Sequence, residues 1–305
     1  MSKNSRALLF NVLAIFCWAI SPIAIRYIKE FFPVNFQNFF RYFVSLFIIW
    51  PVFLVSHSRA EVQEHLRKLP TLLGKFFLIA CINYIFQLSF TYSFFLLYPG
   101  FGVLIYKMGV IFSVFLAAAF FPDERNALKN RLFQSGLLLA FIGVILTIIG
   151  SQDFGHVEFN LGIVLILLAA AAWSLLTALV KKWLPGIPAS FSVSVVLTIV
   201  TPLYLLTDIV MNRGIRLPEA PLSAWLFMII SGFIGVGIAH SSYYHSVPVL
   251  GVALCASLDL SRPFIAGLLS FLIFGESLTV WQIIGGLLLL FGSYLVIRIR
   301  FQSKP

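Results

Sequence analysis

Charged residues are scarce in this sequence of 305 residues. Asp, Glu, Lys and Arg together make up only 10% of the chain, whereas 60% of its residues are hydrophobic. A soluble globular domain usually contains about 25% charged residues, so this chain has too few charges to solvate a surface in water. The scarcity argues against a soluble enzyme, a disordered protein and a nucleic-acid-binding module.

Cysteine is also rare, and the three cysteines lie far apart in apolar stretches, at Cys17, Cys81 and Cys255. They show neither the spacing of a metal site nor a paired framework, so we interpret them as packing residues. None of the glycine groups follows a predicted strand, as a nucleotide-binding loop would require. We therefore expect no metal, no cofactor and no nucleic acid as ligands of this protein.

Long apolar runs, in contrast, are abundant. A membrane-spanning helix needs about 20 mostly apolar residues, and we identify ten runs of this kind. They lie at 8–27, 36–55, 72–96, 100–121, 132–150, 161–180, 190–210, 222–244, 250–274 and 280–297. The expected fold is an all-α integral membrane protein with ten transmembrane helices in the lipid bilayer. The charged segment 57–70 is interpreted as a cytoplasmic connection, with a short surface helix as one form it can take.

The lysines and arginines predict how the chain crosses the membrane. With the N-terminus placed in the cytoplasm, 14 of the 21 basic residues fall on the inside, 4 fall on the outside and 3 lie within spans. Cytoplasmic loops of membrane proteins carry an excess of Lys and Arg. We therefore expect a multi-pass protein of the bacterial inner (plasma) membrane with both termini in the cytoplasm.

The two halves of the chain resemble one another. Trp18 aligns with Trp173 and Pro33 with Pro188 at an offset of 155 residues, and one proline and two glycines, Pro99, Gly136 and Gly143, find matches at an offset of 149. Each half holds five predicted spans, and an odd number makes the second half enter the membrane from the opposite side. Unless apolar sequences align here by chance, the chain consists of two inverted five-helix repeats, 1–152 and 153–305. Such repeats commonly build secondary transporters with a midplane site.

The C-terminal stretch RPFIAGLLSFLIFGESLTVWQIIGGLLLLFGSYLVI at 262–297 carries a resemblance to a known family. It resembles EamA-type members of the bacterial ten-span drug/metabolite transporter superfamily. The matching residues there are Pro263, Gly275, Glu276, Gly285 and Gly292. The Trp18 segment and Arg41 extend the resemblance over nearly the whole chain. It implies a transporter of small metabolites, such as an exporter or permease for metabolites or amino acids.

Two positions depart from the pattern of that family. Ile111 stands where the family usually has a proline in span 4. Arg262 stands where the family usually has an acidic residue before the span 9 proline. The first departure leaves a kink in span 4 in doubt, and the second predicts a cavity with different electrostatics.

Ionisable residues inside membrane spans are costly and are therefore candidate functional residues. Lys107 lies in predicted span 4, and Asp259 and Arg262 lie in predicted span 9. Matching Glu124 with Glu276, at an offset of 152 residues, aligns Lys107 with Asp259. In the family that the chain resembles, spans 4 and 9 line the central cavity. We predict that the three residues bind a charged substrate or coordinate a proton. The alternative is a structural pair between Asp259 and Arg262, which would leave Lys107 unpaired.

Span 3 carries a second polar signal. Asn83, Gln87 and Thr91 recur every four residues and share one helix face, flanked by Tyr84. Because lipid offers no hydrogen-bond partners, this face should point into the helix bundle. There it either contacts a substrate, with Gln87 as the central contact, or bonds to a neighbouring helix.

Four further residues are open to two interpretations each. Trp18 and Trp173 lie in mid-span, where they either stack on a substrate or pack in the core. Arg41 lies some five residues into span 2 and either belongs to the site or snorkels to the outer interface. His240 can titrate near neutral pH, but we favour a lone, packed histidine.

The sequence therefore predicts a secondary transporter that moves a small polar solute by alternating access. Three basic residues against one acidic residue within the spans favour an anionic solute. A passive facilitator or channel, a scaffold and a membrane-embedded enzyme are the alternatives. An enzyme is the weakest of them, because Asp259 is the only deep carboxylate. The substrate, the direction of transport, the coupling ion and the oligomeric state, a homodimer included, stay open.

Overall fold

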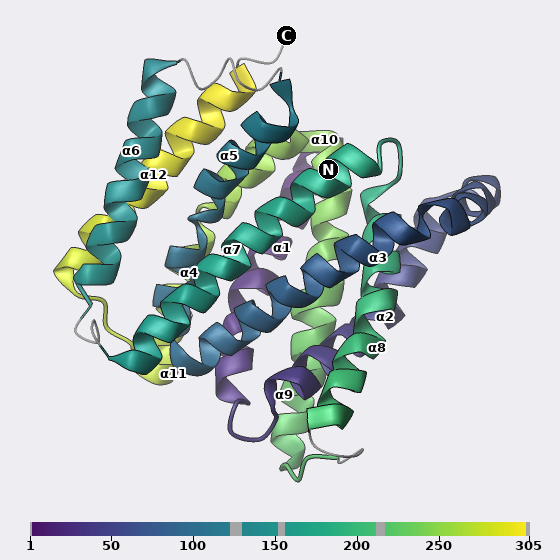
Figure 1. Cartoon of the computed structure of the whole chain (residues 1–305), viewed down its shortest axis with the longest axis horizontal. Coiled ribbons are helices and arrows are strands. Elements are labelled where there is room, and N and C mark those ends of the chain that lie inside the picture. The colour runs from purple at the N-terminus through teal and green to yellow at the C-terminus, as the bar shows by residue number, and fades with distance from the viewer. Residues whose placement is uncertain (1, 123–129, 152–155, 212–216, 303–305) are drawn as a thin grey trace.

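The computed structural model describes residues 2–122, 130–151, 156–211 and 217–302, and statements about structure concern these residues. Within them the chain is helical, with no strand. The helices in chain order are α1 (Lys3–Tyr27), α2 (Val34–Ser56), α3 (Arg59–Leu96), α4 (Pro99–Tyr106), α5 (Gly109–Phe120), α6 (Arg131–Ile149), α7 (Val157–Trp183), α8 (Ala189–Met211), α9 (Leu222–Gly232), the π-helix η2 (Phe233–Ile238), α10 (Ala239–Asp259), α11 (Arg262–Phe274) and α12 (Val280–Gln302). Figure 1 shows their arrangement.

Eight helical segments of the described chain are long and apolar enough to cross a membrane. They are Lys3–Tyr27, Val34–Ser56, Arg59–Leu96, Pro99–Phe120, Arg131–Ile149, Glu158–Trp183, Ala189–Met211 and Leu222–Val247. Two further apolar helices, Arg262–Phe274 and Val280–Val296, are shorter. The all-α membrane fold is thus confirmed, while the exact number of ten crossings stays a prediction.

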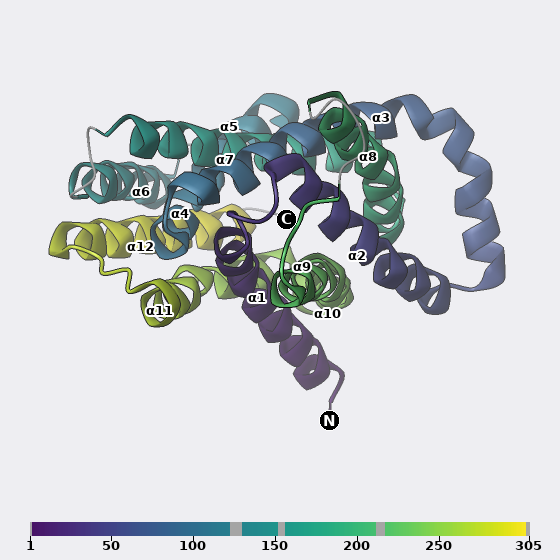
Figure 2. The ribbon, with the colours of Figure 1, turned by 90° about the horizontal axis from the view of Figure 1, so that it is seen from below.

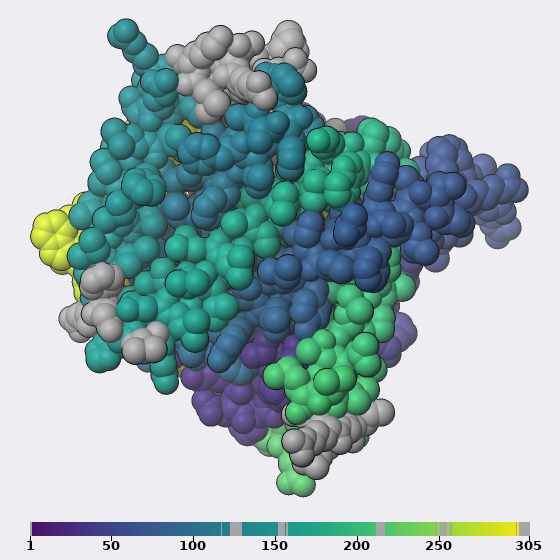
Figure 3. All heavy atoms as spheres, in the orientation of Figure 1, coloured from purple at the N-terminus to yellow at the C-terminus, as the bar shows by residue number. Residues whose placement is uncertain are grey.

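Helix α3 begins earlier than the predicted span at 72–96. A capping box starts it at Arg59: the Ser58 hydroxyl accepts from the Glu61 N–H at 3.3 Å, and the Glu61 carboxylate accepts from the Ser58 N–H at 2.7 Å. The charged segment 57–70 is therefore mostly the first part of one long helix. This part of α3 projects from one edge of the molecule (Figures 2 and 3).

The predicted boundary between spans 8 and 9, at 245–249, is wrong. The chain stays helical from α9 through η2 and along α10 to Asp259, and the interruption comes at Leu260 and Ser261. The predicted boundary contains a proline, Pro248, but neighbouring helices make a proline tolerable inside a membrane helix. The interruption therefore lies at the candidate residues themselves.

The predicted span at 100–121 is also interrupted. Helix α4 ends at Tyr106 and α5 starts at Gly109, with two turn residues, Lys107 and Met108, between them. Predicted span 4 is therefore interrupted even though Ile111, and not a proline, stands at the position where the family usually has one. Ser174 of α7 stabilises it, because the Ser174 hydroxyl donates to the Gly109 carbonyl at 2.9 Å.

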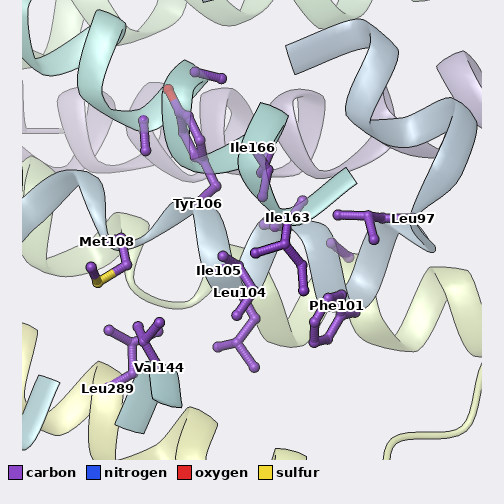
Figure 4. Close-up of a cluster of buried hydrophobic side chains, with 14 of the residues drawn as sticks. Leu97, Phe101, Leu104, Ile105, Tyr106, Met108, Val144, Ile163, Ile166 and Leu289 are labelled. Carbon is purple, nitrogen blue, oxygen red and sulfur yellow. The ribbon is translucent and has the colours of Figure 1, made fainter. Parts of the chain in front are cut away.

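Helix α4 lies in the largest buried apolar cluster among the described residues, which fixes the position of this interruption. Residues of α4, α6, α7 and α12 meet there (Figure 4), including Leu104, Ile105, Val144, Ile163 and Leu289. Helices α6 and α12 run side by side in both ribbon views (Figures 1 and 2). Glycines permit this approach: a Cβ atom added to Gly285 would lie 2.6 Å from the Gly143 carbonyl oxygen.

Charged side chains also bind helix ends that are not part of the two interruptions. The Glu276 carboxylate accepts from the N–H groups of Gly100 and Phe101, at 2.9 and 2.8 Å, and so caps the N-terminus of α4. At the C-terminus of α3, Arg26 donates to the Leu97 carbonyl at 2.9 Å and Lys29 to the Phe95 carbonyl at 3.1 Å. Glu276 thus makes a helix-end contact, whereas Glu124 lies outside the described residues.

Candidate functional site

The interruption between α10 and α11 exposes one backbone carbonyl. In an unbroken helix the N–H of residue 263 would bond to the carbonyl of Asp259, four residues earlier. Pro263 has no N–H, so it leaves that carbonyl without its helical partner. A tight turn closes the chain instead, with the Ser261 N–H bonded to the Leu258 carbonyl at 3.0 Å.

Lys107 binds the carbonyl that Pro263 leaves free. Its ammonium nitrogen donates to the Asp259 carbonyl oxygen at 2.7 Å and to the Asp259 carboxylate oxygen Oδ2 at 2.5 Å. Lys107 itself is the C-cap of α4 and is only 5% exposed. A single buried ammonium group therefore joins the two helix interruptions.

Arg262 completes a charged triad with this pair. Its Nε atom lies 3.4 Å from Oδ1 of Asp259, an ion pair without hydrogen-bond geometry. Both atoms are buried, and neither has a hydrogen-bond partner among the described residues. Its guanidinium carbon lies 5.6 Å from the ring centroid of Trp18 and 5.4 Å from that of Tyr106. The two rings hold the cation by cation–π attraction. The triad carries a net charge of +1 and has polar atoms free to bind a ligand.

The predicted pairing of Asp259 with Arg262 alone is therefore incomplete. Lys107 is paired with Asp259 at 2.5 Å, the position with which the repeat aligns it. Whether the triad binds a substrate stays a prediction.

The polar face of α3 forms a network with α2. The Tyr42 hydroxyl lies 3.2 Å from Oδ1 of Asn83 and 3.1 Å from Oε1 of Gln87. Gln87 also donates to Asn38 at 3.3 Å, and the Thr91 hydroxyl donates to Asn38 at 2.6 Å. All five side chains are buried. The structure thus places these groups in helix–helix bonds, and a substrate contact by Gln87 would have to replace one of them.

Tyr84 lies away from the charged triad. Its ring stacks on Tyr204 of α8 with centroids 4.5 Å apart, and its hydroxyl donates to Thr207 at 3.0 Å. It joins α3 to α8.

The two tryptophans differ in their surroundings: Trp173 packs on Phe86 with ring centroids 5.0 Å apart, whereas Trp18 lies against Arg262.

His240 contacts the same tryptophan from α10. Its ring is 5.4 Å from that of Trp18, and its Nδ1 atom is 2.8 Å from the Val236 carbonyl oxygen. This is the packed, hydrogen-bonded state that the sequence favours for this residue. His240 therefore borders the triad through Trp18 without touching Asp259.

Arg41 does not snorkel to the membrane interface. It is 1% exposed, and its Nη2 atom donates to the hydroxyl of Ser21 on α1. The interpretation as an interfacial anchor is wrong because α9 covers this part of α2. A Cβ atom on Gly232 would lie 2.7 Å from the Arg41 carbonyl oxygen.

Sequence reasoning missed four contributing residues: Tyr106, Tyr42, Asn38 and Ser21. For two of them the sequence contains a usable pattern, since Asn38 and Tyr42 are four residues apart and share a helix face. Tyr106 had none, because its role depends on the helix interruption beside it.

A hollow of about 570 Å³ lies elsewhere, where α3 meets α4 and α11 meets α12. Its lining includes Tyr98, Phe101, Glu158, Glu276 and Gln282, but none of the triad residues. Both carboxylate oxygens of Glu276 are already bonded to the N-terminus of α4. We therefore do not assign the candidate site to this hollow.

Comparison with known proteins agrees with the membrane architecture. The model of the EamA-like transporter family matches two segments of the chain, 5–149 and 160–298. A protein of Haemophilus influenzae described as an uncharacterized transporter is 25% identical over 199 residues, which cover 65% of this chain and 64% of that protein. The match thus spans a little under two thirds of this relative's length. A solved crystal structure, whose description states no activity, shares the fold with a TM-score of 0.64 and 17% identity, covering 99% of this chain and all of the other.

Proposed function

The chain belongs to the EamA-like transporter family, and from this premise we propose that it is a secondary transporter for small anionic solutes. The family and the relative are transporters by name. The proposal adds a location for the binding site and a mechanism, alternating access. It also adds a substrate charge. The site is the triad of Lys107, Asp259 and Arg262.

The observation that carries the proposal is the meeting of two interrupted helices at one ion pair, in which Lys107 is buried and Asp259 is partly buried. Transporters commonly place their sites where discontinuous helices leave backbone groups unpaired near the midplane. Here the unpaired group is the Asp259 carbonyl, and Lys107 reaches it from the other interruption. A movement of one half against the other would stretch or break this contact. Alternating access would therefore change the geometry of this ion pair.

The charges of the triad support an anionic solute. Asp259 carries one negative charge against two positive charges, and the free donor atom is on Arg262. A substrate carboxylate would be attracted to the surplus cation and would hydrogen-bond to its free N–H. We assign anion binding rather than proton transfer to the triad, because Asp259 already contacts both cations.

We further propose that the protein resides in the bacterial inner membrane with both termini in the cytoplasm. The excess of Lys and Arg on one side supports this orientation. Cysteine accessibility at positions near the two termini would test it in intact cells. Labelling from the outside would contradict it.

Counterflow in proteoliposomes tests the function. Vesicles preloaded with each member of a panel of metabolites should accumulate the labelled form of the transported solute, with and without a pH gradient. Flux without saturation or counterflow would support a channel instead, and no flux of any solute would favour a scaffold.

The site is tested in the same assay with a matched pair of variants. Lys107→Ala should abolish counterflow, whereas Lys68→Ala should not. Lys68 is the appropriate control because its ammonium group also lies 2.5 Å from a carboxylate, that of Glu64, but both side chains are more than half exposed. Full activity of Lys107→Ala at normal membrane abundance would contradict the assignment.

A further inference from the structure

Arg41 is a second buried cation in the interior, separate from the triad. Its only hydrogen bond in the described part of the chain is to the Ser21 hydroxyl, and its Nε and Nη1 atoms are buried without a partner. None of the ion pairs between described residues includes Arg41. A guanidinium group with unused donors is therefore enclosed by protein.

Such an arrangement is costly unless something compensates the charge. Arginine keeps its proton in proteins, so it cannot become neutral when it is buried. A buried ion without a counterion is strongly unfavourable, and buried charges are normally paired. A hydroxyl group offers a hydrogen bond but no negative charge. Among the described residues, no anion forms an ion pair with Arg41.

The two interior arginines contact one face of α1. Arg41 reaches Ser21, and Arg262 lies over Trp18. Trp18 and Ser21 are three residues apart, so they are neighbours on the same helix face. Their separation along the axis of α1 is about 4.5 Å, from the 1.5 Å rise per residue. The two cations thus contact neighbouring turns of one helix.

Helix α9 and the π-helix η2 close the region around Arg41 and Ser21 in the present conformation. A Cβ atom on Gly235 would lie 2.9 Å from the Ser21 Cβ atom, and Gly232 packs equally closely on the Arg41 backbone. The π-helix that contains Gly235 interrupts the regular helix there. Irregular turns of this kind are frequent at functional sites.

We propose that Arg41 is the second anchoring point of a dianionic substrate, a short dicarboxylate, whose other carboxylate binds at Arg262 and Lys107. Among the described side chains the site then contains three cations and one carboxylate, a surplus that two negative charges neutralise. This inference rests on the proposed function, since it assumes that the triad binds one end of the substrate.

Binding of two matched probes tests the proposal. Succinate carries two carboxylates, and succinamate has the same chain with one carboxylate replaced by a neutral amide. The full-length protein in nanodiscs should bind succinate at least tenfold more tightly than succinamate. Arg41→Gln should remove this difference by weakening succinate alone, whereas the exposed control Arg59→Gln should keep it.

Two results would overturn the proposal: equal binding of the two probes by the wild-type protein, or an unchanged preference in Arg41→Gln. If Arg41→Gln does not fold, Arg41→Lys takes its place. It should weaken succinate severalfold and leave succinamate unchanged, and equal effects on both would overturn the proposal. Failure here is distinguishable from failure of the proposed function. Anion counterflow that depends on Lys107 would persist if only the second anchoring point were wrong.

Discussion

Replacing Asp259 should destabilise the protein more than replacing Lys107, although the two residues form one ion pair. The reason is the third member of the triad, Arg262. Asp259→Asn removes the only negative charge and leaves two cations facing each other, with a net charge of +2. Lys107→Met leaves Asp259 beside Arg262, with a net charge of zero.

The distances give the order of magnitude. At an effective dielectric constant near 20, unit charges 2.5 Å apart attract by about 7 kcal/mol and those 3.4 Å apart by about 5 kcal/mol. The hydration lost on burial offsets much of this attraction, so removing one partner of a buried pair typically costs about 3–5 kcal/mol. We expect a loss in this range for Asp259→Asn. For Lys107→Met, where Asp259 keeps a partner, we expect about 1–3 kcal/mol.

The assay is thermal unfolding of the purified protein in detergent, measured for both variants and for the surface control Lys68→Met. The control removes a pair with the same 2.5 Å distance but with side chains 51% and 60% exposed, so it should cost less stability than either triad variant. The double variant Lys107→Met with Asp259→Asn restores a net charge of +1 and should be more stable than Asp259→Asn alone. If Lys107→Met unfolds at the same temperature as Asp259→Asn, or below it, the reasoning from three coupled charges is refuted.

Three further changes test the helix contacts. Gly143→Ala should lower stability by about 1–3 kcal/mol, because the added Cβ atom would lie 2.9 Å from a backbone carbon of α12. Gly74→Ala is the control: its Cβ atom would have no described atom within 4 Å, so this substitution should be neutral or slightly stabilising in the same thermal assay. Equal effects of these two substitutions would contradict the close approach of α6 and α12. Glu276→Gln should cost about 1–2 kcal/mol by weakening the cap of α4 while the KM for the transported solute stays unchanged, and a change in KM alone would instead indicate substrate binding. Tyr42→Phe should cost about 1 kcal/mol through the lost bonds to α3, and unfolding at the wild-type temperature would show that these bonds are dispensable.

The alignment of the two halves indicated that Lys107 and Asp259 are related positions, but it did not predict that they form an ion pair. Residues at matching positions of two related halves occupy matching places in the fold, so the alignment of Lys107 with Asp259 by itself puts them at related positions. The helix interruptions were harder to predict. A hydropathy window averages over about 20 residues, and two turn residues such as Leu260 and Ser261 do not lower that average enough to be seen.

Arg41 shows a different limit of sequence reasoning. Its distance from the start of span 2 indicates a depth but says nothing about the direction of the side chain. The pattern of polar residues nevertheless indicates the direction, because Asn38, Arg41 and Ser45 recur at helical spacing. In the structure all three are buried, whereas Phe43 and Phe47 are exposed. What no pattern revealed is that the guanidinium group would lack a counterion, because that depends on every helix around it.

The ion pair also bears on how such a chain can originate. Lys107 follows the last residue of α4 and Asp259 is the last residue of α10, so both stand where a helix is interrupted. In a symmetric dimer of identical half-chains, both copies would present the same side chain at this point. Two lysines or two aspartates in contact repel each other. Opposite charges at the centre require that the halves differ, and covalent fusion into one chain lets each position change independently. The attraction between the two interruptions is therefore available to a fused tandem and not to an assembly of identical halves.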